Sequence, residues 1–162
     1  MLSAFNIINS SSSKQSVIKI AQLNANHSPA AITNLASYCH QQQIDIMCIS
    51  EPPIRCSVPN INKSLCPIFA NIPAGRSVRA SICVLNRSIN PMIISHLSSN
   101  DCVVCQVGQL VIVCMYMPPH INVSNQLNQI GEIARYASNK KLIITGDFNA
   151  ANQYWFSTST DN

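Results

Sequence analysis

Short apolar runs, separated by turn-forming residues, are the feature that most constrains how this sequence can fold. The runs are rich in β-branched residues, so they predict buried strands. They lie at 17–23, 45–50, 81–85, 92–94, 102–107, 110–117 and 142–145. Two other stretches carry apolar residues at helical spacing and predict helices over 29–42 and 123–138. The first of these begins with Ser28 and Pro29, a pair typical of a helix start.

The order of these elements predicts an α/β fold, a layered sandwich of mixed, largely antiparallel sheets flanked by helices. A strand, a helix and a second strand follow one another between residues 17 and 50, which is typical of a βαβ unit. The closely spaced runs after residue 80 predict antiparallel strands. The 162 residues fit a single domain. Residues 1–15, which end in a run of serines, are expected to form a polar tail.

Composition excludes several classes of protein. Only 10% of the residues are charged and 47% are hydrophobic, the opposite of a disordered chain. No apolar run approaches the roughly 18 residues of a membrane span, so no membrane partner is expected. Ten Lys and Arg against six Asp and Glu give a net charge of +4, which is compatible with a phosphate-rich partner but does not require one.

The cysteines favour a reducing, intracellular compartment. Cys48, Cys83 and Cys114 lie inside apolar runs, where cysteine behaves as a small hydrophobic residue. Cys102 and Cys105 form a C-x-x-C pair, but no second pair at zinc-binding spacing follows, so we expect a strand there. The first residues also lack the pattern of a signal peptide. Disulfides are rare inside cells, in agreement with cysteines used as core residues.

Two of the six acidic residues, Glu51 and Asp147, directly follow fully apolar strands. Ligand and catalytic groups of α/β proteins gather at the carboxyl ends of strands. Asn24 ends the first apolar run in the same way, Tyr116 ends another, and Asn149 follows Asp147 by two residues. Carboxylate and amide oxygens suit a hard cation such as Mg²⁺, held by one or two carboxylates and a substrate phosphate. These five residues are therefore candidates for one site.

Other polar residues have simpler interpretations. Asp45 opens a strand, Asp101 lies in a turn, and Glu132 is placed to pair with Arg135 on a helix. The four histidines are expected in loops or on the surface: His27, His40, His96 and His120.

Four short motifs occur in order: Gln22 to Asn26, Ser50 to Pro53, Tyr116 to Pro119 and Gly146 to Ala150. Together they resemble the endonuclease/exonuclease/phosphatase superfamily, and in particular the apurinic-like endonuclease domains of non-LTR retrotransposons of the R1, I and jockey kind. Further matches to that branch are Gly75-Arg76, Trp155 and Thr160-Asp161. The resemblance covers residue 17 to the end and implies a DNase I-like fold.

The resemblance implies hydrolysis of DNA phosphodiesters with Mg²⁺ or Mn²⁺. By motif match, Glu51 would coordinate the metal with Asn24 beside it. Asp147 would orient or deprotonate the attacking water, and Asn149 would help to hold the phosphate and that water. Tyr116 would offer its hydroxyl to the scissile phosphate. In the retrotransposon setting the domain nicks chromosomal DNA in the nucleus, and a reverse transcriptase module of the same polyprotein extends the nick.

The sequence departs from the family pattern in two places. Ala151 stands where the family has His, and the sequence ends at Asn162, before the Ser-Asp-His segment that completes the family's site. We therefore expect a domain over 16–162 that lacks its final strands, in a truncated and impaired copy. Two alternatives stay open: a phosphatase or phosphodiesterase of the same superfamily, and a non-enzymatic remnant that at most binds nucleic acid. Three arginines are candidates for nucleic-acid binding: Arg76, Arg79 and Arg87.

Overall fold

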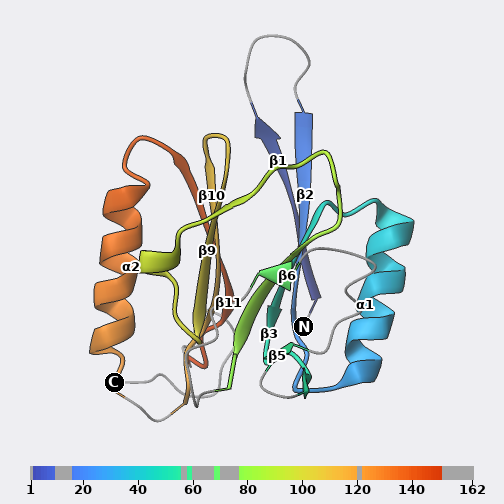
Figure 1. Ribbon diagram of the computed structural model, residues 1–162, viewed down its shortest axis with the longest axis horizontal. Helices are drawn as coiled ribbons and strands as arrows, with labels where there is room; N and C mark the ends of the chain where they lie inside the picture. Colours follow the sequence, from blue (N-terminus) through green and yellow to red (C-terminus); the bar gives the residue numbers. More distant parts are fainter. Residues whose placement is uncertain are drawn as a thin grey trace.

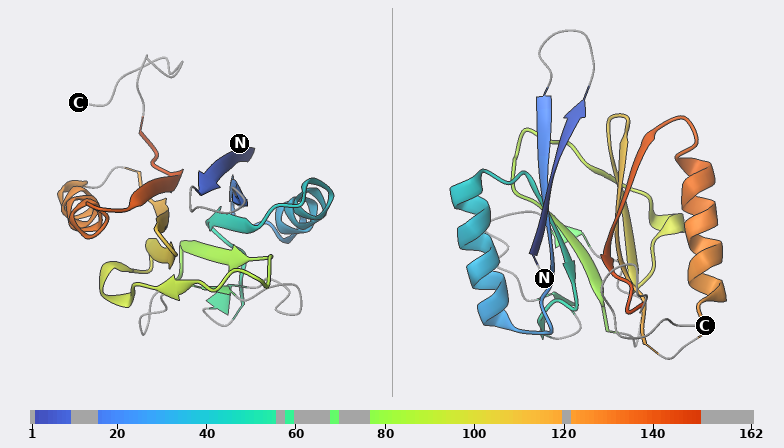
Figure 2. Two further views of the ribbon diagram at one scale, coloured as in Figure 1. Left: turned by 90° about the horizontal axis from the view of Figure 1, so that it is seen from above. Right: turned by 180° about the vertical axis from the view of Figure 1, so that it is seen from behind.

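Two large sheets pack face to face, and one helix covers the outer side of each (Figures 1 and 2). The structure is a computed structural model that describes residues 2–9, 16–55, 58–59, 68–69, 77–119 and 122–150. The predicted layered α/β sandwich is confirmed, with both parallel and antiparallel strand pairs.

The first sheet has the strand order β1-β2-β3-β7-β6. These strands are β1 (Leu2–Asn9), β2 (Ser16–Asn24), β3 (Ile46–Ser50), β6 (Ile68–Phe69) and β7 (Ala80–Val84). β2 and β3 are parallel and are joined by α1 (Pro29–Gln42), which confirms the predicted βαβ unit. The Ser28 hydroxyl accepts a hydrogen bond from the backbone N–H of Ala31, and Pro29 occupies the first turn. β4 (Ile54–Arg55) and β5 (Val58–Pro59) form a separate small ladder.

Part of the expected N-terminal tail is a strand. Within residues 1–15, the structure describes 2–9, and these residues form β1, antiparallel to β2 along its full length. Without β1, β2 would be an edge strand with a row of unpaired backbone groups, and pairing with β1 satisfies that row. The expectation of a polar tail is therefore wrong for residues 2–9. Residues 10–15 lie outside the described part of the chain.

The second sheet has the order β11-β10-β9-β8. Its strands are β8 (Met92–Ile93), β9 (Cys102–Val107), β10 (Leu110–Tyr116) and β11 (Lys141–Asp147). β10 pairs with β9 in antiparallel fashion and with β11 in parallel. A short 3₁₀ turn, η1 (Ser95–Leu97), follows β8, and α2 (Ser124–Tyr136) connects β10 to β11. The bounds predicted from the apolar runs agree with these to within one or two residues at most ends.

Three apolar layers hold these elements together. One lies between the two sheets, where Ile20, Ile82 and Ile112 are fully buried. The second lies between the first sheet and α1, and the third between the second sheet and α2. On α2, Ile133 is buried, and so is Ala137, which directly follows the helix, whereas Ala134 is exposed.

The described cysteines are core residues. All six are buried, including Cys102 and Cys105, which lie in β9 as predicted. Burial raises the pKa of each of these two thiols to about 12. Neither α1 nor α2 has the length and apolar character that a bilayer crossing would need, and they are the α-helices of the described ranges.

Candidate active site

The carboxyl ends of two parallel strand pairs, one from each sheet, meet at one edge of the sandwich. In the first sheet, Asn24 at the end of β2 lies opposite Ser50 at the end of β3, and Glu51 follows. In the second sheet, Tyr116 at the end of β10 lies opposite Asp147 at the end of β11. Because parallel strands end on the same side, side chains far apart in sequence are gathered there.

The side-chain amide of Asn24 joins the two carboxylates. Its Nδ2 donates to Glu51 Oε2 at 2.9 Å and to Asp147 Oδ2 at 2.5 Å. Its Oδ1 accepts the backbone N–H of Asn26 at 2.8 Å. This last bond fixes the orientation of the amide, so the nitrogen rather than the oxygen faces the acids. Sequence reasoning placed Asn24 beside the metal but gave no indication of this bridging position.

A left-handed turn aims Glu51 into the site. Its backbone φ is +47°, and its N–H donates to the Arg79 carbonyl at 2.8 Å. Its own carbonyl accepts the N–H of His27 at 2.9 Å. These bonds hold a conformation that side-chain-bearing residues seldom adopt, and such local strain is concentrated at functional sites. The Glu51 side chain is 19% exposed.

Asp147 is set by the residues on either side of it. Gly146 has φ +140°, and a Cβ added there would lie 1.7 Å from the Met115 carbonyl oxygen, so only glycine fits. Asn149, with φ +45°, donates its backbone N–H to Asp147 Oδ1 at 3.0 Å. The Asn149 side-chain amide donates to the Met117 carbonyl at 2.8 Å. The turn after β11 is thereby tied to the end of β10.

Tyr116 is buried beside the two acids. Burial raises the pKa of its phenol above the usual 10.0, and a hydrogen bond to Glu51 and the negative charges of Glu51 and Asp147 raise it further. The Arg79 guanidinium acts in the opposite direction and lowers the same pKa. The phenol therefore stays protonated through the neutral range and keeps a hydrogen to donate.

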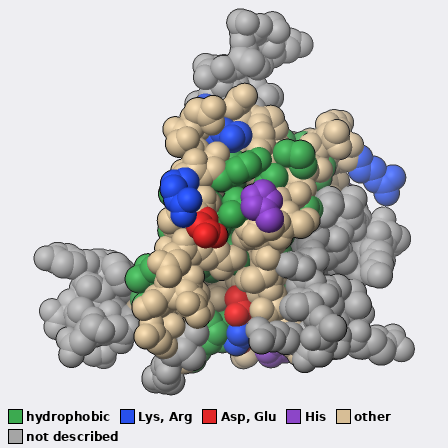
Figure 3. Space-filling model, turned by 60° about the vertical axis from the view of Figure 1, so that its left-hand side comes forward, with side chains coloured by type: hydrophobic (Ala, Val, Ile, Leu, Met, Phe, Trp, Pro, Cys, Tyr) green, Lys and Arg blue, Asp and Glu red, His purple; other side chains and the backbone are tan. Residues whose placement is uncertain are grey.

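Two of the three arginines predicted to bind nucleic acid lie at opposite ends of β7. Arg79 precedes β7 at the site edge, whereas Arg87 follows the other end of β7 and is exposed. Arg76 lies outside the described residues. On the face shown in Figure 3 the blue side chains of the described residues are scattered and form no continuous patch.

Sequence reasoning missed two residues at this edge. His27, expected in a loop, does lie in one, but its Nε2 is 3.8 Å from Glu51 Oε1 and its side chain is 53% exposed. Its place next to the Gln22 to Asn26 motif was the available signal. Asp101, interpreted as a turn residue, pairs with Arg79 through two hydrogen bonds. Nothing in its local sequence indicates that partner. His40 and His96 are exposed as expected, and His120 lies outside the described residues.

An open pocket of about 440 Å³ lies over the acids, lined by Gln22, Asn24, Asn26, Glu51, Gly146 and Asp147. Two carboxylates and several side-chain amides line this pocket, and oxygen ligands of these kinds fit a hard divalent cation. No group of three or more His, Cys, Asp or Glu residues with metal-binding geometry exists among the described residues. A cation would therefore depend on one or two carboxylates together with substrate oxygens, as Mg²⁺ commonly does.

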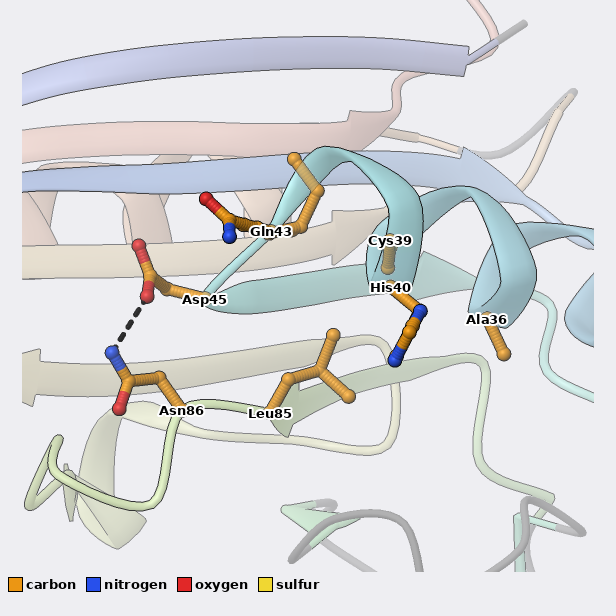
Figure 4. Close-up of a pocket in the computed structure, with 8 residues that line it drawn as sticks. Ala36, Cys39, His40, Gln43, Asp45, Leu85 and Asn86 are labelled. Carbon is orange, nitrogen blue, oxygen red and sulfur yellow. Dashed lines mark hydrogen bonds between the residues drawn. The ribbon is translucent and has the colours of Figure 1, made fainter.

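A larger hollow, of about 710 Å³, lies at the opposite end of the first sheet (Figure 4). It is lined mainly by apolar atoms from the end of α1 and the residues after β7. Its carboxylate, Asp45, accepts the side-chain amide of Asn86 at 2.7 Å and the backbone N–H of Lys19 at 2.8 Å. Asp45 is thus engaged in holding the start of β3, in agreement with its predicted structural role.

Comparison with known proteins identifies the kind of fold. The sequence model of a family described as endonuclease-reverse transcriptase matches residues 110–162. The endonuclease domain of TRAS1, a telomere-specific non-LTR retrotransposon, is similar in structure, with a TM-score of 0.77 and 24% identity over 89% of this chain. This chain spans 64% of the length of that TRAS1 chain. No curated protein sequence matches significantly.

Two further solved structures share the fold at lower identity. An AP endonuclease from Archaeoglobus fulgidus has a TM-score of 0.58 and 13% identity, with 83% of this chain and 58% of that chain covered. TDP2 from D. rerio, complexed with single-strand DNA product, has a TM-score of 0.58 and 16% identity, with 83% and 62% covered. The DNase I-like fold and the resemblance to retrotransposon endonucleases predicted from the motifs are thus confirmed. Ala151, Trp155 and Thr160-Asp161 lie outside the described residues.

Proposed function

We propose that this chain is the catalytic part of a metal-dependent endonuclease that hydrolyses DNA phosphodiester bonds. The observation that carries the proposal is the Asn24 amide, which bridges the carboxylates of Glu51 and Asp147 from opposite sheets. The two acids line an open pocket, and the phenol of Tyr116 lies beside them, an arrangement that suits phosphodiester hydrolysis with a hard cation. The likeness to TRAS1 and the other nucleases supports DNA as the substrate.

Mg²⁺ or Mn²⁺ is the cation we propose, with Glu51 as its principal protein ligand and Asn24 beside it. When bound, the cation would neutralise charge that develops on the phosphate. Asn24 has a second task, because its amide holds Asp147 and Glu51 at a fixed separation although both are acidic. Like charges this close would otherwise repel one another.

Asp147 is the residue we propose to accept a proton from the attacking water. The Asn149 N–H fixes its Oδ1, while Oδ2 faces the pocket beside Asn24. Tyr116 would donate its hydrogen to a non-bridging oxygen of the phosphate, and its raised pKa keeps that hydrogen in place at neutral pH. Asn149, held by Met117, would complete the phosphate-binding edge.

In its wider setting, the proposed enzyme would nick chromosomal DNA in the nucleus, next to a reverse transcriptase module of the same polyprotein. Impairment of this chain relative to a longer protein also remains a proposal. The likeness to retrotransposon endonucleases supports a DNA-nicking enzyme rather than a phosphatase. Binding of DNA by Arg76, Arg79 and Arg87 stays a prediction.

The test is cleavage of supercoiled plasmid by the full protein that contains this chain. We expect conversion of supercoiled to open-circular DNA with Mg²⁺ or Mn²⁺, and none with EDTA. A small phosphate monoester, assayed in parallel, should be a far poorer substrate. Hydrolysis of the monoester with no nicking would favour the phosphatase alternative. DNA binding without either activity would favour the non-enzymatic remnant.

A further inference from the structure

A short loop, residues 99–101, is hydrogen-bonded to the residue that precedes β7 and to the last residue of β10. The Asn100 carbonyl accepts the N–H of Arg79 at 2.7 Å, and the Asp101 carbonyl accepts the N–H of Tyr116 at 2.7 Å. The Arg79 carbonyl in turn accepts the N–H of Glu51 at 2.8 Å. The backbone of Arg79 therefore lies between the loop and Glu51, and the loop is bonded directly to Tyr116.

The side chains of Arg79 and Asp101 form a two-point ion pair above this backbone. Arg79 Nε donates to Asp101 Oδ1 at 2.6 Å, and Nη2 donates to Oδ2 at 2.7 Å. Asn100 Nδ2 adds a third hydrogen bond to Oδ1 at 2.9 Å. The Arg79 and Asp101 side chains are 33% and 17% exposed. A paired fork of this kind fixes the plane of the guanidinium, which a lysine could not do.

The fixed guanidinium lies against the ring of Tyr116. Its Cζ is 5.2 Å from the ring centroid, within the range of a cation–π contact. Arg79 is thus a cation in contact with the ring of Tyr116, whose hydroxyl is hydrogen-bonded to Glu51.

We propose that Arg79, oriented by Asp101, is a positioning residue for Tyr116. The inference rests on the proposed function, since it assigns Arg79 a task in the same site. The ion pair holds the ring so that its hydroxyl stays directed at the acids and at a phosphate bound there.

The first test is spectroscopic and does not depend on activity. Tyrosines of the 162-residue chain are replaced by 3-fluorotyrosine, and the Tyr116 signal is identified by its loss in Tyr116→Phe. In Arg79→Gln the chemical shift of that signal at neutral pH should change, because the guanidinium no longer lies against the ring. Arg135→Gln removes an equal charge from an exposed position on α2 and should leave the chemical shift unchanged. An unchanged chemical shift in folded Arg79→Gln overturns the inference.

A second variant keeps the test decisive if Arg79→Gln does not fold. Arg79→Lys retains a positive charge but cannot form the fork with Asp101. We expect the chemical shift of Tyr116 at neutral pH to change, because the planar guanidinium no longer lies on the ring. A Tyr116 signal identical to that of the unaltered chain overturns the inference.

The third test is a double-mutant cycle on plasmid nicking by the full protein. Arg79→Gln should lower kcat/KM about tenfold, within the range found for coupled neighbours. In a Tyr116→Phe background the same change should cost less than about twofold, since the group that it positions is gone. Equal losses in both backgrounds would mean that Arg79 acts independently of Tyr116. Full nicking by Tyr116→Phe alone would instead refute the proposed role of Tyr116, and the inference with it.

Discussion

Asn24 and Asp147 are 123 residues apart in sequence, yet the amide of one donates to the carboxylate of the other at 2.5 Å. The same amide nitrogen bonds Glu51, so one neutral side chain holds two acids together. The amide thereby links the ends of β2 and β11 across the two sheets.

The bridging amide should therefore be important for stability when no metal is bound. Asn24→Ala removes two hydrogen bonds to charged groups and leaves the acids facing one another, so we expect a loss of about 1–2 kcal/mol in unfolding free energy. Adding Mg²⁺ should recover much of that loss, because the cation offsets the repulsion between the two carboxylates. Urea unfolding with and without Mg²⁺ measures both effects.

Asn128→Ala is a suitable control, since Asn128 lies exposed on α2. It should leave the response to Mg²⁺ as it is in the unaltered chain. Equal stability of Asn24→Ala and the unaltered chain without metal would contradict the bridging role.

Asp147 should be required for chemistry. Asp147→Asn keeps the shape of the side chain but cannot accept a proton from water, so nicking by the full protein should fall by about 10²–10⁴-fold. Glu132→Gln removes the same charge from an exposed part of α2 and should have no effect. Initial rates on supercoiled plasmid provide the comparison. Unchanged nicking by Asp147→Asn would exclude Asp147 as the base.

Gly146 should tolerate no side chain. The added methyl of Gly146→Ala would lie 1.7 Å from the Met115 carbonyl oxygen, at a φ of +140°, so the strand β11 would have to move. We expect a loss of at least ~3 kcal/mol, or failure to fold. Gly131→Ala, in α2 with no atom within 4 Å, should instead stabilise the chain by roughly 0.5–1 kcal/mol. Thermal unfolding of the two variants should move in opposite directions.

Buried thiols should make the fold sensitive to alkali. The pKa of Cys105 is raised by burial from 9.0 to about 12, so the folded chain keeps a proton that the unfolded chain loses. The contribution of this thiol to the unfolding free energy is complete below pH 9. Between pH 9 and 12 the unfolding free energy falls by up to ~1.4 kcal/mol per pH unit.

The slope of stability against pH tests this origin. Cys105→Ala should lower stability by a constant amount below pH 9 because it leaves a cavity. Above pH 9 its stability should fall less steeply than that of the unaltered chain. Denaturant unfolding from pH 8 to pH 10.5 gives both slopes, and parallel curves would show that Cys105 does not contribute.

Much of the architecture follows from local sequence. The apolar runs and the Ser28-Pro29 start predict β2, α1 and β3, since burial and capping are local preferences that the tertiary structure here reinforces. The strand ends at Glu51 and Asp147 stand out because acidic residues are scarce. Leu2–Asn9 was not predicted as a strand, because its pairing depends on the free edge of β2 rather than on its own pattern.

By itself, the sequence determined both helices, most of the strands, the residues at their ends and the family that they resemble. Only the tertiary structure decided which of those ends share a site and how their side chains are oriented. It made the Asn24 amide the bridge between two acids, placed His27 beside Glu51, and joined Asp101 to Arg79 and Tyr116. The physical reason is that periodicity and burial are properties of neighbouring residues, whereas hydrogen bonds between sheets depend on how distant segments pack.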